Sequence, residues 1–158
     1  MNIEMRRKDK EMDKTGTIDV LLNSRTGRLG TCSDNIPYIT PVNYIYYDGC
    51  IYFHCARVGR KIDNIKLNNN VCFEVDDYIS TYQQEDPRKL STNYKSVIIF
   101  GKAEIIDDED VKLDIMKRTV DKYSNMEGTS NRLLKEHTAP ILIVKITPEH
   151  ITGKISIK

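Results

Sequence analysis

Two adjacent cations, Arg60 and Lys61, follow Gly59 at the start of a short stretch with helical spacing, residues 60–68. Cations in the first turn of a helix face the positive end of its dipole, which is mildly unfavourable. A bound anion would turn that penalty into an attraction and would also use the free backbone N–H groups of the turn. The pair therefore indicates either an anion site or two side chains that simply extend into water.

A second unusual feature is the run Thr40-Pro41-Val42-Asn43 inside a strand-like segment, residues 38–46. Proline removes a donor from a strand ladder, and asparagine is a poor strand former. A gap in the ladder would expose polar groups to a planar ligand with a hydrogen-bonding edge. An edge strand with a bulge is an equally good interpretation.

His54 and Cys55 are neighbours in a predicted strand, residues 50–55. Adjacent strand residues point to opposite faces, so they cannot form a Cys–His dyad, although each can touch a ligand near the end of the strand. His137 and His150 have no metal-ligand spacing with His54, and the four cysteines contain no Cys-x-x-Cys pair. No metal site is therefore expected.

The pattern of apolar residues and turn signals predicts the elements that position these groups. Thr17 is expected to cap a short helix, and Asp107 or Asp108 a longer one with Val111, Ile115, Met116, Val120 and Tyr123 along one side. The predicted strands are 27–31, 38–46, 50–55, 71–76, 94–106, 140–146 and 151–157, with turns at 33–35 and at Asp48-Gly49 and a bend or bulge at Gly101. The polar residues 79–93 read as a long loop, which is often functional. Strands with local hairpins favour a mainly β fold, an antiparallel barrel with peripheral helices.

Length and charge restrict the class of protein further. The 158 residues fit one domain, 1–158, with a charged lead, 1–14, that is either flexible or in contact with a second subunit. The 24 basic and 23 acidic residues nearly cancel, and no basic stripe suggests binding to nucleic acid. The apolar runs are too short to span a membrane, and the N-terminus lacks the apolar core of a signal peptide. A cytoplasmic location is expected.

A family resemblance is carried by the run GRLGTCSDNIPYITPVNYIYYDGCIYFHCARVGRKIDNIKLNNNVCFEVD, the later segment YKSVIIFGKAEII and the closing ITGK. These segments resemble the nitroimidazole-resistance branch of the pyridoxamine-5'-phosphate-oxidase-like superfamily. The resemblance covers about residues 5–157. It implies a six-stranded split β-barrel of the FMN-binding type, and a homodimer that binds two FMN molecules at the subunit interface.

The same resemblance assigns roles to individual residues. The positions matching Arg60 and Lys61 hold the FMN phosphate, and those matching Thr40, Pro41, Val42 and Asn43 line the isoalloxazine ring. His54 and Cys55 correspond to the strand end beside the flavin, and Ser96 matches a polar position that contacts the cofactor. Two departures disfavour pyridoxamine-phosphate oxidation: Tyr38 stands where those enzymes tend to carry arginine, and PEHITGKISIK lacks their arginine and histidine pattern. In addition, Cys55 replaces a frequent small hydroxyl residue.

The resemblance implies an FMN-dependent oxidoreductase that reduces a small acceptor such as a nitro-aromatic compound. A flavin performs hydride and electron transfer itself, so no side chain has to be a general acid or base. If a proton donor is required, His54 is the candidate, since the ordinary pKa of histidine lies near neutrality. The alternative is a flavin-binding or small-molecule-sensing protein without turnover. Haem is disfavoured because neither His137 nor His150 lies in a recognisable motif.

Overall fold

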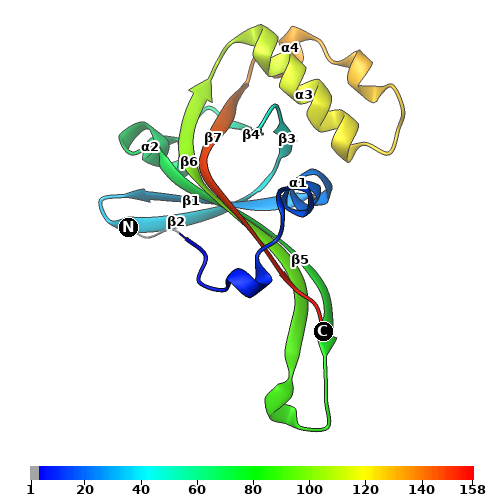
Figure 1. Cartoon of the computed structure of the whole chain (residues 1–158). Helices are drawn as coiled ribbons and strands as arrows, with labels where there is room; N and C mark the ends of the chain where they lie inside the picture. Colours follow the sequence, from blue (N-terminus) through cyan, green and yellow to red (C-terminus); the bar gives the residue numbers. More distant parts are fainter. Residues whose placement is uncertain (1–3) are drawn as a thin grey trace.

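The computed structural model describes residues 4–158, which form one antiparallel sheet with helices around it (Figure 1). The sheet has seven strands in the order β2-β1-β5-β6-β7-β4-β3. The strands are β1 Thr26–Ser33, β2 Ile36–Asn43, β3 Ile45–Tyr47, β4 Cys50–Ala56, β5 Asn70–Tyr82, β6 Ser91–Ile106 and β7 Ile141–Ser156. The α-helices are α1 Lys14–Asn23, α2 Arg60–Leu67, α3 Glu109–Tyr123 and α4 Lys135–Thr138, and η1 Lys8–Lys10, η2 Pro87–Lys89 and η3 Thr129–Arg132 are short 3-10 turns. The predicted mainly β class with peripheral helices is confirmed.

The sheet has seven strands where the resemblance implies six, and the segments predicted from the sequence are divided differently in two places. The segment expected at 38–46 is divided at Tyr44, where the chain leaves β2 at one edge of the sheet and enters β3 at the other. The segments expected at 140–146 and 151–157 form a single strand, β7, whose pairing with β6 shifts register beside Gly101. The bulge predicted at Gly101 is therefore confirmed.

Curling of the sheet brings its two edges together as a split barrel. Strands β2 and β4 contact each other although they are far apart in the strand order. Tyr44, at the crossing, is fully buried, and its hydroxyl donates to the backbone oxygen of Leu21 at 2.8 Å. Its backbone N–H donates to the Tyr123 hydroxyl oxygen at 2.9 Å, which ties the crossing to the end of α3.

The core follows the alternation of the strands. Val71, Phe73 and Val75 of β5 point inward, as their spacing predicts. The ring of Phe73 meets that of Tyr44 edge to face, with 4.9 Å between centroids. Burial of a side chain of this size contributes about 1.5–3 kcal/mol. A Cβ on Gly27 would lie 2.1 Å from the Phe73 ring, so the close approach of β1 to this ring requires glycine.

The predicted loop at 79–93 is too long at both ends. Strands β5 and β6 continue to pair out to Tyr82 and Ser91, so only residues 83–90 lie between them. Figure 1 shows this two-stranded ribbon projecting beyond the barrel. Most side chains of this part of β5 are exposed, so the segment lacks the alternation of apolar and polar residues that reveals a strand in sequence.

The helix predictions hold in part. Asp13, not Thr17, caps α1, because its carboxylate accepts from the Gly16 N–H at 2.7 Å while Thr17 lies inside the first turn. Asp108 caps α3 as expected, accepting from two backbone N–H groups. The face of α3 that is buried consists of Lys112, Ile115 and Thr119, so of the predicted apolar stripe only Ile115 is fully covered.

The lead segment and the membrane question can be stated for the described residues. From Lys10 to Met12 the lead runs along β7: the Lys10 ammonium donates to Ser156, Glu11 forms a bridge with Lys154, and the Met12 N–H donates to the Gly153 carbonyl. Residues 1–3 lie outside the described part. Among the helices from residue 4 onward, none has the length and apolar character needed to cross a membrane.

Lys122, near the end of α3, carries a buried ammonium for which residues 4–158 provide no hydrogen-bond partner. It lies 4.2 Å from the centroid of the Tyr44 ring, an arrangement that partly compensates its charge. Burial, and secondarily the charge of Arg25, lowers the pKa of Lys122 to about 8. The unfolded chain therefore binds more protons than the folded protein between about pH 8 and the ordinary lysine value of 10.5, so stability rises with pH in that window.

We expect Lys122→Met to remove this rise and to stabilise the protein at pH 7 by about 1 kcal/mol, a value reduced by solvent screening of a half-buried group. Urea unfolding of both proteins at several pH values from 7 to 10.5 measures the difference. Equal pH dependence in the two proteins would show that the Lys122 ammonium is not desolvated.

Candidate functional site

The split between β2 and β4 holds a cavity of about 540 Å³, here called the β2–β4 pocket. Its walls come from the end of β2, the end of β4, the first turn of α2 and the start of β7. It is lined by Pro41, Val42, Asn43, His54, Cys55, Ala56, Lys61, Pro140 and Ile141. Six of the residues that the sequence singled out for cofactor binding are thus brought together: Pro41, Val42, Asn43, His54, Cys55 and Lys61.

The first turn of α2 contributes Lys61 to the pocket. Gly59 is the N-cap residue with φ 133°, a backbone conformation that favours glycine, and it offers no side chain to the free N–H groups. A Cβ added at Gly59 would meet no atom within 4 Å, so the approach to this helix end is open. Arg60 takes a different direction: its guanidinium lies 5.2 Å from the centroid of the Tyr38 ring, and it does not line the pocket. The geometry suits an anion held by Lys61 and backbone N–H groups.

Strand β2 forms the opposite wall. It is an edge strand, as one of the two interpretations held, but it pairs with β1 residue by residue from Ile36 to Asn43 without the expected bulge or gap. Proline is tolerated because the backbone edge turned away from β1 needs no donor there. The Thr40 hydroxyl is buried and finds no hydrogen-bond partner among residues 4–158. Leaving such a group unpaired costs about 1–3 kcal/mol.

His54 and Cys55 lie on opposite faces of β4, as predicted, with Cys55 buried and His54 exposed. Burial, opposed by the charge of Lys61, raises the pKa of the Cys55 thiol, so it is protonated at neutral pH. The chain around His54 partly desolvates the imidazole although the side chain is exposed, and this desolvation, together with a smaller effect of the Lys61 charge, lowers the pKa of His54. The imidazole is therefore mostly neutral at pH 7, which makes it a poorer proton donor than its ordinary pKa suggests.

Thr40, Arg60 and Ser96 were predicted at the site but do not line the pocket. Thr40 in β2 and Arg60 in α2 are the sequence neighbours of the lining residues Pro41 and Lys61. Ser96 lies on β6, opposite Asp76 and Lys154, on the same sheet face as Ile98 and Phe100. A single chain does not bring Ser96 to the β2–β4 pocket.

Sequence reasoning missed Ala56, Pro140 and Ile141. Ala56 and Ile141 are paired across β4 and β7, which are separated by more than eighty residues of chain, so the contact depends on register alone. Proline before an apolar run was the only local signal of this wall. No group of three or more histidine, cysteine or acidic side chains suited to a metal occurs in the part of the chain that the structure describes.

Comparisons with known proteins agree with this architecture. The family model described as pyridoxamine 5'-phosphate oxidase matches residues 13–155. A search of curated proteins finds no significant match.

Several solved structures are similar in fold. The flavocytochrome Anf3 from Azotobacter vinelandii has a TM-score of 0.86 at 19% identity, over 98% of this chain and 73% of that one. A putative 5-nitroimidazole antibiotic resistance protein from Bacteroides thetaiotaomicron has a TM-score of 0.79 at 22% identity, over 92% and 86% of the two chains. An FAD-binding protein from Mycobacterium smegmatis has a TM-score of 0.64 at 23% identity, over 92% and 96%. At these identities the three structures establish a shared fold.

The influence of Lys61 on His54 can be tested directly. We expect Lys61→Ala to raise the pKa of His54 part of the way toward its ordinary value, because burial, the larger cause, remains. Titration of the imidazole by NMR measures the change. Lys66→Ala, on the same helix, is the matched control and should leave the His54 titration as in the wild type. An unshifted His54 in Lys61→Ala would mean that the two side chains are further apart in solution.

Proposed function

The chain belongs to the pyridoxamine 5'-phosphate oxidase family, and from this premise we propose that it is a flavoprotein that binds FMN in the β2–β4 pocket. We propose further that it is an oxidoreductase, which reduces a small acceptor such as a nitro-aromatic compound. One observation carries the proposal: Lys61 and the start of α2, which has no side-chain cap, lie on one side of the pocket, and the edge strand β2 lies on the other.

The two halves of FMN have matching surroundings. The phosphate fits the first turn of α2, where Lys61 and free N–H groups offer positive charge. The ring fits against β2, which pairs only with β1 in the described structure and so leaves one backbone edge available beside Pro41–Asn43. Lys61 is the only cationic side chain that lines the pocket in the described part of the chain, which suits one phosphate, and for this reason we propose FMN and not a dinucleotide.

When bound, the flavin supplies hydride and electron transfer, and the protein supplies binding and orientation. His54 and Cys55 are both uncharged at neutral pH, so the wall from β4 offers hydrogen bonds and apolar surface rather than charge. This suits a neutral aromatic ring system. The chemistry requires no acid or base from the chain.

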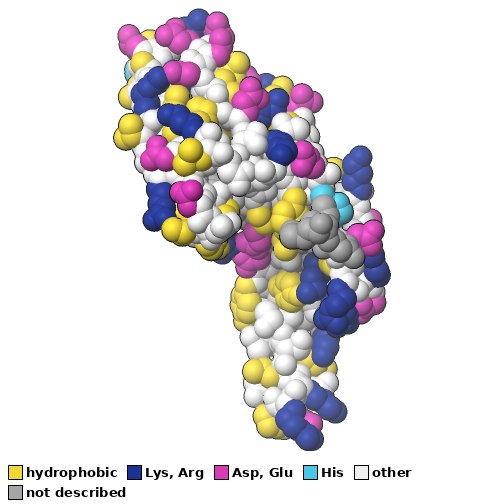
Figure 2. All heavy atoms as spheres, turned by 90° about the vertical axis from the view of Figure 1, so that its left-hand side faces the viewer, with side chains coloured by type: hydrophobic (Ala, Val, Ile, Leu, Met, Phe, Trp, Pro, Cys, Tyr) yellow, Lys and Arg dark blue, Asp and Glu magenta, His cyan; other side chains and the backbone are white. Residues whose placement is uncertain are grey.

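A homodimer with the cofactor near the interface is the second part of the proposal. The outer sheet face exposes apolar side chains, with Ile39 68% and Ile98 38% exposed. It also holds an apolar groove of about 540 Å³ between β1, β2, β5 and β6. Figure 2 shows further hydrophobic side chains on the projecting ribbon. A second copy packed on this face would cover its apolar side chains. In such a dimer, Ser96 of one protomer would contribute to the pocket of its partner.

Flavin binding tests the first part. We expect Lys61→Ala to weaken FMN binding roughly tenfold to a hundredfold, the range for a lost charge-assisted hydrogen bond, and to leave riboflavin binding nearly unchanged. Quenching of flavin fluorescence on titration with protein gives both affinities. Lys66→Ala is the matched control. A wild-type protein that binds neither flavin would remove the proposal, and tighter binding of FAD than of FMN would reassign the cofactor.

Turnover separates a reductase from a flavin-binding or sensing protein. Consumption of reduced nicotinamide that depends on both bound flavin and an added nitro-aromatic acceptor would support the reductase. Stable flavin binding with no turnover by any donor would favour the non-catalytic alternative.

Sedimentation velocity tests the dimer. We expect the wild type to sediment as a dimer and Ile98→Glu to shift it toward monomer, because a charge would be buried in the interface. Val111→Glu on α3, a residue of similar exposure, is the control and should leave the mass unchanged. A monomeric wild type would contradict this part of the proposal.

A further inference from the structure

Three residues, Arg57, Val58 and Gly59, link the end of β4 to the first turn of α2. This link joins two walls of the β2–β4 pocket, His54–Ala56 on one side and Lys61 on the other. Val58 is 80% exposed, and Gly59 has no side chain. Arg57 is therefore the residue of the link whose side chain can fix its position.

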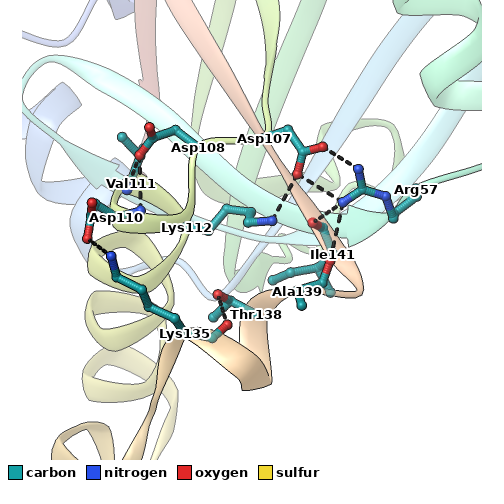
Figure 3. Close-up of polar contacts among 10 residues, drawn as sticks. All are labelled: Arg57, Asp107, Asp108, Asp110, Val111, Lys112, Lys135, Thr138, Ala139 and Ile141. Carbon is teal, nitrogen blue, oxygen red and sulfur yellow. Dashed lines mark hydrogen bonds and ion pairs between the residues drawn. The ribbon is translucent and has the colours of Figure 1, made fainter.

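The guanidinium of Arg57 leads away from the link to the third wall (Figure 3). Its Nη1 donates to the backbone oxygen of Ala139 at 3.2 Å and to that of Ile141 at 3.4 Å. These two carbonyls flank Pro140, and Pro140 and Ile141 line the pocket. One guanidinium thus contacts the carbonyl oxygens of both residues that flank the proline.

Arg57 is itself held by the turn between β6 and α3. Both of its terminal nitrogens contact the carboxylate of Asp107, with Nη1 at 2.9 Å from Oδ1. The ammonium of Lys112, only 2% exposed as a residue, donates to the same Oδ1 at 2.9 Å. Hydrogen bonds from Arg57 and then Lys112 hold the pKa of Asp107 well below its usual range, so the carboxylate stays charged. Figure 3 shows the three side chains converging beside the α4–β7 turn.

A salt bridge with this much exposure contributes little to stability by itself. The arrangement has a more specific consequence: it couples β4, the β6–α3 turn and the α4–β7 turn through one planar group. The planar guanidinium holds the Asp107 carboxylate with two nitrogens while one of them also contacts the two carbonyls, a fixed geometry that a single ammonium nitrogen does not provide.

We propose that Arg57 is a positioning residue that fixes the Pro140–Ile141 wall of the β2–β4 pocket, and that this wall sets the affinity for the flavin ring. Only the statement about flavin affinity rests on the proposed function. Arg57 acts through the backbone of residues 139–141, with Asp107 and Lys112 holding it in place. Arg57 contacts the Pro140–Ile141 wall and not Lys61. Its replacement should therefore weaken binding of the flavin ring and not binding of the phosphate.

The first test uses the flavin-free protein. We expect Arg57→Gln to speed amide hydrogen exchange in the segment 136–143, and Arg118→Gln to leave that exchange unchanged. Arg118 is a suitable control because it also pairs with an aspartate, Asp114, at 2.9 Å and lies on α3, outside the pocket. Unchanged exchange in Arg57→Gln would overturn the assignment, whether or not the protein binds flavin.

The second test measures FMN and riboflavin affinities of the same variants. We expect Arg57→Gln to weaken both ligands by a similar factor, roughly tenfold, and to alter the visible spectrum of bound flavin, since the supporting shell sets the geometry of a site. Asp107→Asn should give a smaller loss of both. Wild-type affinities in Arg57→Gln, or a loss confined to FMN, would overturn the role at the ring. Failure of the wild type to bind either flavin would instead remove the proposed function, and the exchange result would still decide whether Arg57 orders the wall.

Discussion

The crossing at Tyr44 is the constraint on which the rest of the structure depends. There the chain passes from one edge of the sheet, β2, to the other, β3 and β4. Tyr44 can occupy the interior because its hydroxyl and its backbone N–H both find partners, on Leu21 and Tyr123. The crossing holds two unpaired edges close together without joining them, and the cavity between them is the β2–β4 pocket.

The pocket combines groups that a sheet alone would not provide. An edge strand leaves backbone polar groups available, and the start of α2 adds positive charge that no side-chain cap satisfies in the described structure. These features are costly in an isolated fold, since they leave donors, acceptors and charge without partners. They become favourable when one ligand carries both a polar ring edge and an anion. The proline and asparagine in β2 and the cations at the start of α2 would then all serve the binding of one ligand.

The support of the pocket comes from outside it. Arg57, Asp107 and Lys112 lie around its rim and connect three segments that are far apart in the chain. The outer sheet face carries both the exposed apolar residues and Ser96, so in the proposed dimer this face would also contribute to the site. The site therefore depends on the positions of several backbones more than on any single reactive side chain, as expected where a cofactor supplies the chemistry.

The sequence by itself determined the mainly β class, the α2 helix after Gly59, the Asp48-Gly49 hairpin and the opposite faces of His54 and Cys55, because each depends on neighbours within a few residues. Local irregularity and family resemblance also predicted that Pro41–Asn43 and Lys61 belong to one site, and the structure places them around one pocket. Only the tertiary structure decided that β5 and β6 extend into both ends of the predicted loop, that Tyr44 divides one strand into two, and that Pro140 and Ile141 form a wall of the pocket. Those features arise from pairing between distant segments, and the register of such pairing leaves little trace in the order of residues along either one.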